Sequence, residues 1–188
     1  MSTSEPSSPR QRLLAAVVAV MTERGSTDWS LRSLAEAIGT SHRMLIYHFG
    51  SLDGLMIAVV GQVDAAARER YAALSEEYDD PLAAARAWWE QLADPEQAAG
   101  ERLFFELYAA ALQGKEHARP LLEGVINDWL APLTAAFAEL TGDPSTAAVD
   151  ARLGVAVVRG LLLDLLASGD SDGVTAAHER YLALYSAD

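Results

Sequence analysis

Apolar residues recur at spacings of three and four along most of this chain, and glycine or proline interrupts them between one run and the next. The first run places Leu14, Val17, Val18 and Met21 on one helical face and stops at Gly25. Later runs follow the same rule, and no stretch shows the sustained alternation of a β-strand. The spacing therefore predicts an all-α fold of about nine helices.

Composition excludes several classes of protein. The 188 residues include no cysteine, which rules out disulfide scaffolds, cysteine-ligated metal centres and thiol catalysis. No glycine-rich phosphate loop, serine-hydrolase motif or zinc-protease histidine pair occurs. The aspartates near Gly173 lack the glutamate of a calcium loop, because Tyr181 stands in its place. We therefore expect no enzyme activity, no metal, no cofactor, and a plain loop over residues 169–173.

The N-terminus superficially matches a secretion signal, because Arg10 and Arg12 precede an apolar stretch. Thr22-Glu23-Arg24 follows that stretch in place of a small-residue cleavage site, which favours a helix of the folded protein. Elsewhere no run reaches the ~18 uncharged apolar residues of a membrane span. We expect a cytoplasmic protein without membrane contact, preceded by a disordered Ser/Pro-rich tail over residues 1–9.

Residues 30–49 carry the pattern that points to a function. Three apolar residues within 31–38 fall on one face of a helix that Ser30 can cap. After Gly39, Ser41 can cap a second, shorter helix. A packed helix, a glycine turn and a short helix form the layout of a helix-turn-helix, whose second helix enters the major groove of DNA. The pattern therefore predicts binding to double-stranded DNA.

The second of these helices begins with polar groups of the kind that contact DNA. His42 and Arg43 follow its cap, and Leu45 and Phe49, four residues apart, can anchor it to a core. Met44 suits either that core or the methyl group of a thymine. The predicted DNA-binding residues are Ser30, Arg32, Thr40, Ser41, His42, Arg43, Met44, Tyr47 and His48.

Several of these side chains also have a role that needs no DNA. Arg32 and His42 can be ordinary solvated side chains, Tyr47 can pack beneath the helix, and His48 can cap it locally. The two serines act as N-caps in either case, so a phosphate contact would be a second use of groups already placed at helix N-termini.

The run from Arg12 to Leu55 resembles the DNA-binding domain of the TetR/AcrR family of bacterial repressors. The resemblance lies in the Leu-rich first helix ending in Gly25, then Leu34-Ala35-Glu36-Ala37-Ile38-Gly39, Ser41, Leu45, Tyr47-His48-Phe49, Ser51 and Leu55. It implies a three-helix helix-turn-helix DNA-binding domain over residues 10–55 and a helical ligand-binding and dimerisation domain over residues 56–188. It also implies a homodimeric repressor that binds a palindromic operator and is released by a small molecule.

Two positions depart from the family pattern. Ile46 stands where the family usually has tyrosine, and Leu52 stands where a lysine usually contacts a DNA phosphate. Loss of one such cation flattens the salt dependence of binding by about one counterion, whereas Arg43 adds a side chain that can recognise a guanine edge. The alternative prediction is therefore an all-α ligand-binding or protein-interaction module whose DNA reader is weakened or non-functional.

Most of the large aromatic residues lie after position 60, and plain core packing is one explanation for them. The family resemblance implies instead that helices from about residue 82 to residue 126 surround an apolar pocket with a few polar groups. The candidate ligand-binding residues are Trp88, Trp89, Arg102, Phe105, Tyr108, His117 and Asn127. The acidic surroundings favour a neutral or cationic small molecule as the effector.

Residues 146–167 are apolar nearly all round. A helix without a polar face is buried on both sides, which in a chain of this size indicates a partner subunit. The resemblance implies a four-helix dimer interface built from this helix, residues 119–140 and their symmetry mates. The candidate interface residues are Trp129, Leu133, Phe137, Leu153, Val157, Gly160, Leu161 and Asp164.

Net charge separates the two predicted parts of the chain. The formal charge of −13 combines 14 Lys+Arg with 27 Asp+Glu, but residues 1–60 contain five of each and are neutral. The whole excess therefore lies after residue 60, where we expect no contact with DNA. An acidic body lowers non-specific affinity for DNA and makes binding depend more on correct base contacts.

Overall fold

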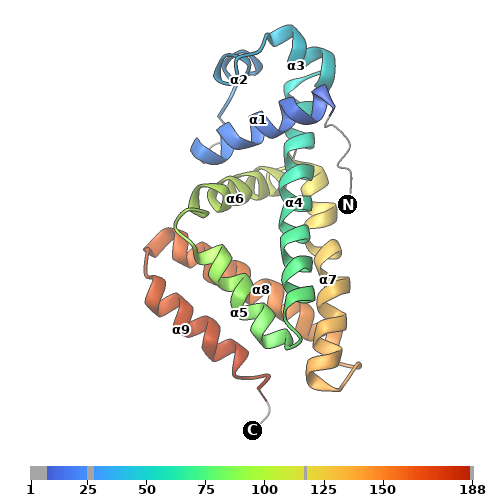
Figure 1. Cartoon of the computed structure of the whole chain (residues 1–188), viewed down its shortest axis with the longest axis vertical. Coiled ribbons are helices and arrows are strands. Elements are labelled where there is room, and N and C mark those ends of the chain that lie inside the picture. Colours follow the sequence, from blue (N-terminus) through green and yellow to red (C-terminus); the bar gives the residue numbers. More distant parts are fainter. Residues whose placement is uncertain (1–7, 25–27, 117, 187–188) are drawn as a thin grey trace. The chain divides into compact units, whose positions relative to one another are not determined.

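The computed structural model of the chain describes residues 8–24, 28–116 and 118–186 and, at 120, 121, 123, 125 and 126, the backbone alone. Within these ranges all regular secondary structure is α-helical, which confirms the predicted fold class (Figure 1). The helices are α1 (Pro9–Arg24), α2 (Leu31–Ala37), α3 (His42–Phe49), α4 (Leu52–Glu77), α5 (Pro81–Ala93), α6 (Ala98–Leu112), α7 (Arg119–Thr141), α8 (Ala147–Ser168) and α9 (Ser171–Leu182).

The first helix begins with a capping box and a proline. The Gln11 N–H donates to Ser8 Oγ at 3.2 Å, and the Ser8 N–H donates to Gln11 Oε1 at 2.7 Å. Pro9 occupies the first helical position, where the missing N–H costs nothing. The predicted disordered tail, residues 1–9, therefore extends too far, because Pro9 is already helical. Residues 1–7 of that tail lie outside the described residues.

The loop predicted over residues 169–173 is shorter than expected, because α9 already begins at Ser171. Asp170 is the N-cap of this helix, and its Oδ1 accepts a hydrogen bond from the Gly173 N–H at 2.9 Å. The carboxylate thus satisfies an N–H group that a helix start leaves without a partner, and the chain becomes helical earlier.

Contacts divide the chain into two compact units. Unit 1 comprises the residues up to Val63 together with 102–122, and unit 2 comprises 64–101 together with 123–188. The contacts therefore group residues 56–63 and most of α6 with the N-terminal helices. The functional boundary after residue 55 stays a prediction.

The core of unit 1 is built from one apolar face of each helix. Val17 and Met21 of α1, Leu34 of α2, Leu45 of α3 and Leu55 of α4 have no accessible surface. Burying a side chain of this kind contributes about 1.5–3 kcal/mol. The short helix α3 packs beside α2 (Figure 1), and such a helix depends on tertiary packing because it is too short to be stable alone.

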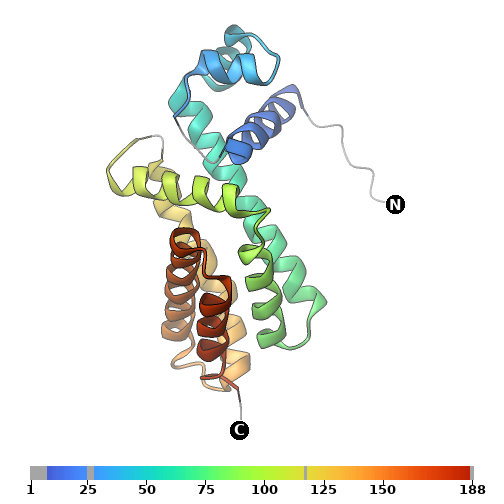
Figure 2. The same cartoon turned by 90° about the vertical axis from the view of Figure 1, so that its left-hand side faces the viewer.

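In unit 2, α8 and α9 lie side by side (Figure 2), and α5 packs on both. Trp89 of α5 stacks on His178 of α9 with ring centroids 4.8 Å apart, and its Nε1 donates to the Thr175 hydroxyl at 3.1 Å. Arg86 and Glu179 add an exposed ion pair at 3.1 Å, which is worth less than about 1 kcal/mol. Burial lowers the pKa of His178, which keeps this side chain a neutral part of the core.

Among the described residues, no single helix is both long and apolar enough to cross a membrane. Only α3 and α4 taken together reach that length and composition, and these two helices are bent by 69° at their junction. In the same part of the chain, no group of three His, Cys, Asp or Glu side chains is placed to hold a metal ion.

Candidate nucleic-acid interface

Hydrogen bonds at the helix starts fix the backbone of the helix-turn-helix segment. The Ser33 N–H donates to Ser30 Oγ at 3.1 Å, and the Ser30 N–H donates to Ser33 Oγ at 3.0 Å, which forms a capping box. At α3 the Met44 N–H donates to Ser41 Oγ at 3.2 Å. Both predicted N-caps are confirmed, and each contributes on the order of 1 kcal/mol. The role of Ser33 in this capping box was not predicted, because the usual residue at the third helical position of a capping box is Glu or Gln.

The turn between α2 and α3 depends on Gly39, whose φ is +67°. A residue with a side chain is strained in this left-handed region, whereas glycine adopts it freely. The Thr40 N–H donates to the Ala35 carbonyl at 2.8 Å and closes the end of α2. The glycine of the sequence pattern is therefore the residue that redirects the chain into α3.

The junction between α3 and α4 is tight enough to require another glycine. Ser51 Oγ accepts a hydrogen bond from the Gly54 N–H at 3.0 Å at the start of α4. A Cβ added at Gly54 would collide with the carbonyl oxygen of Phe49. The role of Gly54 could not be predicted from sequence, because it arises from the close approach of two helices rather than from a spacing.

Helix α3 keeps two side chains in the core and presents the others to solvent. Leu45 is fully buried and Phe49 is 8% accessible, whereas Tyr47 is 78% accessible. Met44 and Ile46 are 40% and 38% accessible, so the core alternative for Met44 and the packing alternative for Tyr47 do not hold. The other predicted DNA-binding residues are exposed at Ser30, Arg32, Ser41, His42 and Arg43 and half-buried at Thr40 and His48.

His48 lies beside this surface with one ring nitrogen buried. Its ring meets the Tyr47 ring edge-on, with centroids 4.9 Å apart. Nε2 has no hydrogen-bond partner within the described part of the chain. A buried polar atom without a partner costs ~1–3 kcal/mol.

Positive charge near α3 comes from its own N-terminus and from α1. The Arg10 guanidinium lies 5.0 Å from the centre of the Phe49 ring, a contact worth ~0.5–1 kcal/mol at an exposed site that leaves the charge in place. Arg43 is exposed on α3. Leu52, by contrast, is a half-buried apolar residue at the first position of α4. The cation that the family pattern places there is therefore absent from this surface.

The predicted ligand-binding residues are divided between the two units. Those of unit 1 are Arg102, which is exposed, and Phe105 and Tyr108, which are half-buried on α6. Those of unit 2 are the buried Trp88 and Trp89 and the exposed Asn127, and His117 lies outside the described residues. Each tryptophan packs against another aromatic ring of unit 2, so core packing accounts for both.

One face of α8 is apolar and open to solvent. Val149, Leu153 and Leu163 are 70%, 46% and 52% accessible, and Ala156 and Gly160 between them are exposed. These five residues recur at spacings of four and three, so they form one stripe along the helix, the α8 stripe. The residues buried on the other side of α8 are Ala147, Ala151, Gly154 and Leu162.

Two of the predicted interface residues contact aromatic rings of unit 2. The Trp129 ring lies 5.5 Å from the Tyr71 ring, and the Phe137 ring lies 5.0 Å from the Tyr185 ring, between centroids. Both aromatic side chains are half-buried in the single chain, and their place in a dimer interface stays a prediction. The remaining predicted interface residues are half-buried at Leu133, Val157 and Leu161 and exposed at Leu153, Gly160 and Asp164.

An all-helical chain with a capped helix-turn-helix near its N-terminus has the arrangement of a transcriptional regulator that binds DNA. No protein-family model matches the chain, and no curated protein sequence does. Solved structures match it over nearly its whole length. A TetR-family member from Streptomyces coelicolor A3 is 30% identical, with 96% of this chain and 100% of that one aligned and a TM-score of 0.69.

Two further structures agree with this match. The multidrug binding protein EbrR, solved with imidazole, is 29% identical over 96% of this chain and 93% of its own, with a TM-score of 0.66. A transcriptional regulator from Rhodococcus sp. Rha1 is 22% identical over 95% and 96%, with a TM-score of 0.80, and shares the fold. The chain belongs to the TetR family of transcriptional regulators, which confirms the predicted resemblance.

Proposed function

We propose that this chain is a cytoplasmic repressor that binds a palindromic operator as a homodimer and is released by a small molecule. The observation that carries the proposal is the solvent face of α3, where Arg43, Met44, Ile46 and Tyr47 are exposed while Leu45 holds the helix to its unit. A face with both a cation and apolar groups suits the major groove, which offers guanine acceptors and thymine methyl groups.

In the proposed complex, α3 recognises bases and the surrounding groups hold phosphates. Arg43 suits the O6 and N7 acceptors of a guanine, a contact worth ~1–3 kcal/mol of discrimination, and Met44 suits a thymine methyl group. The residues proposed to contact the sugar–phosphate backbone are Ser30, Arg32, Thr40, Ser41, His42, Tyr47 and His48.

The homodimer interface is proposed to lie on the α8 stripe. A continuous apolar patch on a soluble chain marks an interaction surface. Apart from the adjoining residues and backbone of α8 itself, no atom of the described residues lies within 4 Å of a Cβ placed at Gly160, so a second helix can approach closely there. A two-fold axis through this contact duplicates α3. The dimer would then recognise two half-sites ~34–36 Å apart, or a multiple of that spacing.

The effector is proposed to bind the helices that follow the DNA-binding segment. EbrR is a multidrug binding protein solved with imidazole, which supports a small-molecule site in a related chain. Release from the operator requires the effector to bind the DNA-free conformation more tightly than the DNA-bound one. The alternative function is a ligand-binding or interaction module without a working reader, which the apolar Ile46 and Leu52 favour.

A mobility-shift assay with the full chain and the DNA that flanks its own gene separates the two. The repressor should give a shift that weakens steeply as salt rises, survives competition by random DNA and footprints a palindrome. Absence of any shift at low salt would contradict the repressor and favour the alternative.

A further inference from the structure

Unit 2 contains a cavity of about 580 Å³ between the second half of α4, the start of α5 and the middle of α7. Ligand sites for drug-sized molecules typically have volumes of ~300–1,000 Å³, so this space is large enough for one. The cavity was not predicted from sequence, because its walls come from three helices that are distant along the chain.

Aromatic rings form part of the wall. Tyr71 and Trp129 line the cavity with their ring centroids 5.5 Å apart, and Trp88 lies behind both at 5.8 and 5.7 Å. Tyr78 lines the cavity as well and is 38% accessible. Burial raises the pKa of Tyr71, so its phenol stays neutral. The faces of such rings attract cations and offer apolar contact to aromatic ligands.

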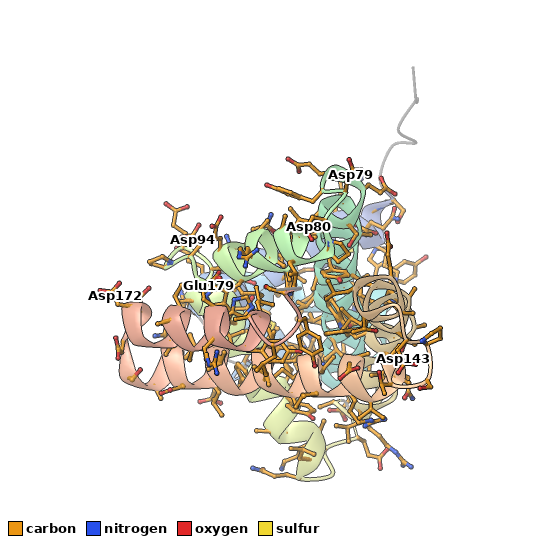
Figure 3. The ribbon with its side chains drawn as sticks, turned by 90° about the horizontal axis from the view of Figure 1, so that it is seen from below. Asp79, Asp80, Asp94, Asp143, Asp172 and Glu179 are labelled. Atoms are coloured by element: carbon orange, nitrogen blue, oxygen red, sulfur yellow. The ribbon has the colours of Figure 1, made fainter. Side chains whose placement is uncertain are left out.

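The charged residues of the wall are mostly negative. Four carboxylates and one arginine line the cavity. That arginine, Arg68, is held by Asp64 at 3.0 Å and by the lining residue Asp128 at 3.4 Å. The other lining carboxylates, Glu76, Asp79 and Glu139, are exposed and make no ion pair with any described residue. Figure 3 shows Asp79 at the turn between α4 and α5.

A proline interrupts the hydrogen bonding of α7 beside the cavity. Pro132 lies inside α7 and lines the cavity. Proline has no N–H, so the Asp128 carbonyl, four residues earlier, loses the donor that a helix normally supplies. The wall of the cavity thus combines aromatic faces with three carboxylates that make no ion pair among the described residues.

We propose that this cavity binds a hydrophobic organic cation, such as a quaternary ammonium or phosphonium compound with aromatic groups. The proposal rests on the proposed function, because it names the chemical class of the effector. An inorganic ion fits less well, since the described residues hold no group of three acidic or histidine side chains placed for a metal. An anion would meet four lining carboxylates and one lining arginine, which is already paired with Asp64 and Asp128.

Tetraphenylphosphonium and tetraphenylborate test the proposal, because the two ions have nearly the same size and shape and opposite charge. Titration calorimetry with the full chain in the absence of DNA should show binding of the phosphonium and binding of the borate at least about tenfold weaker. Equal affinity for the two ions, or no binding of the phosphonium, would overturn the proposal.

Matched variants separate the cavity from the general acidity of the chain. The variant Glu76→Gln/Asp79→Asn/Glu139→Gln removes three exposed lining carboxylates and should weaken phosphonium binding about tenfold or more. The control variant Glu90→Gln/Glu96→Gln/Asp172→Asn removes the same charge from exposed residues that do not line the cavity; Asp172 lies well apart from Asp79 in Figure 3. The control should change the affinity less than about twofold, and an equal loss in both variants would contradict the proposed site.

The experiments distinguish a wrong cation-site proposal from a wrong repressor proposal. A chain that binds the phosphonium but shifts no DNA contradicts the repressor and leaves the cation site standing. A chain that shifts its operator but does not bind the phosphonium overturns the cation-site proposal alone.

Discussion

Side-chain hydrogen bonds in the two units span very different distances along the chain. Those at the starts of α2, α3 and α4 in unit 1 join residues three apart, as between Ser41 and Met44. In unit 2 they also join distant segments, as between Trp89 and Thr175 or between Tyr185 and Asp150. The difference teaches that the reader is specified locally, whereas the helical unit that is proposed to bind the effector and the partner subunit is specified by contacts between distant helices.

The largest effect is expected where unit 2 is proposed to meet a second copy. Leu153→Glu combined with Leu163→Glu would bury charge in the α8 stripe, so we expect the dimer dissociation constant to rise about a thousandfold. Size-exclusion chromatography with light scattering measures the change. Leu112→Glu combined with Leu184→Glu is the matched control, because both residues are comparably exposed, at 66% and 64%, outside the stripe. A stripe variant that stays as dimeric as the control would contradict the interface.

The next largest effect tests whether short-range contacts fix the structure of the DNA-binding segment. Gly54→Ala would force a Cβ against the Phe49 carbonyl oxygen, and we expect it to lower the free energy of unfolding by about 2–4 kcal/mol. Gly61→Ala lies on the same helix, where an added Cβ meets nothing within 4 Å, and should instead stabilise by ~0.5–1 kcal/mol. Urea denaturation of both variants measures the difference, and equal effects would show that the junction is not tight.

The half-buried carboxyl group of Glu101 makes unit 2 sensitive to pH. Burial raises the pKa of Glu101 to about 7 from a usual value of 4.5, partly offset by Arg70. Because the native state then holds the proton more tightly than the unfolded state, this stabilisation is complete below pH 4.5 and is lost as pH rises through 7.

Glu101→Gln should therefore raise the free energy of unfolding by about 2–3 kcal/mol above pH 7 relative to its effect below pH 4.5. Denaturation across this pH range measures the effect, with the exposed Glu96→Gln as the control. A Glu101 variant whose pH profile coincides with that of the control would show that the carboxyl group is not desolvated.

The smallest effect concerns a single cap. Ser41→Ala removes the acceptor of the Met44 N–H and should lower the free energy of unfolding by about 1 kcal/mol, whereas Ser41→Gly should cost only a few tenths. Chemical denaturation of the two variants compares them. If alanine and glycine cost the same, the hydroxyl does not cap α3.

The local specification explains which features could be predicted from sequence. The caps at Ser30 and Ser41 and the turn at Gly39 follow from residue types at fixed spacings. The contact of Trp129 with Tyr71 was not predicted, because an apolar pattern predicts that a side chain is buried and not which surface buries it. For the same reason the cavity in unit 2 has no signature in the sequence.

The claim that α3 recognises DNA bases is tested most directly by the preference of the chain for its operator over random DNA. Competition binding at fixed salt measures this ratio for the native chain, for Arg43→Ala and for the control Arg32→Ala. We expect Arg43→Ala to reduce the preference about tenfold, and Arg32→Ala to weaken both affinities alike. An unchanged preference in Arg43→Ala would contradict base recognition by this helix.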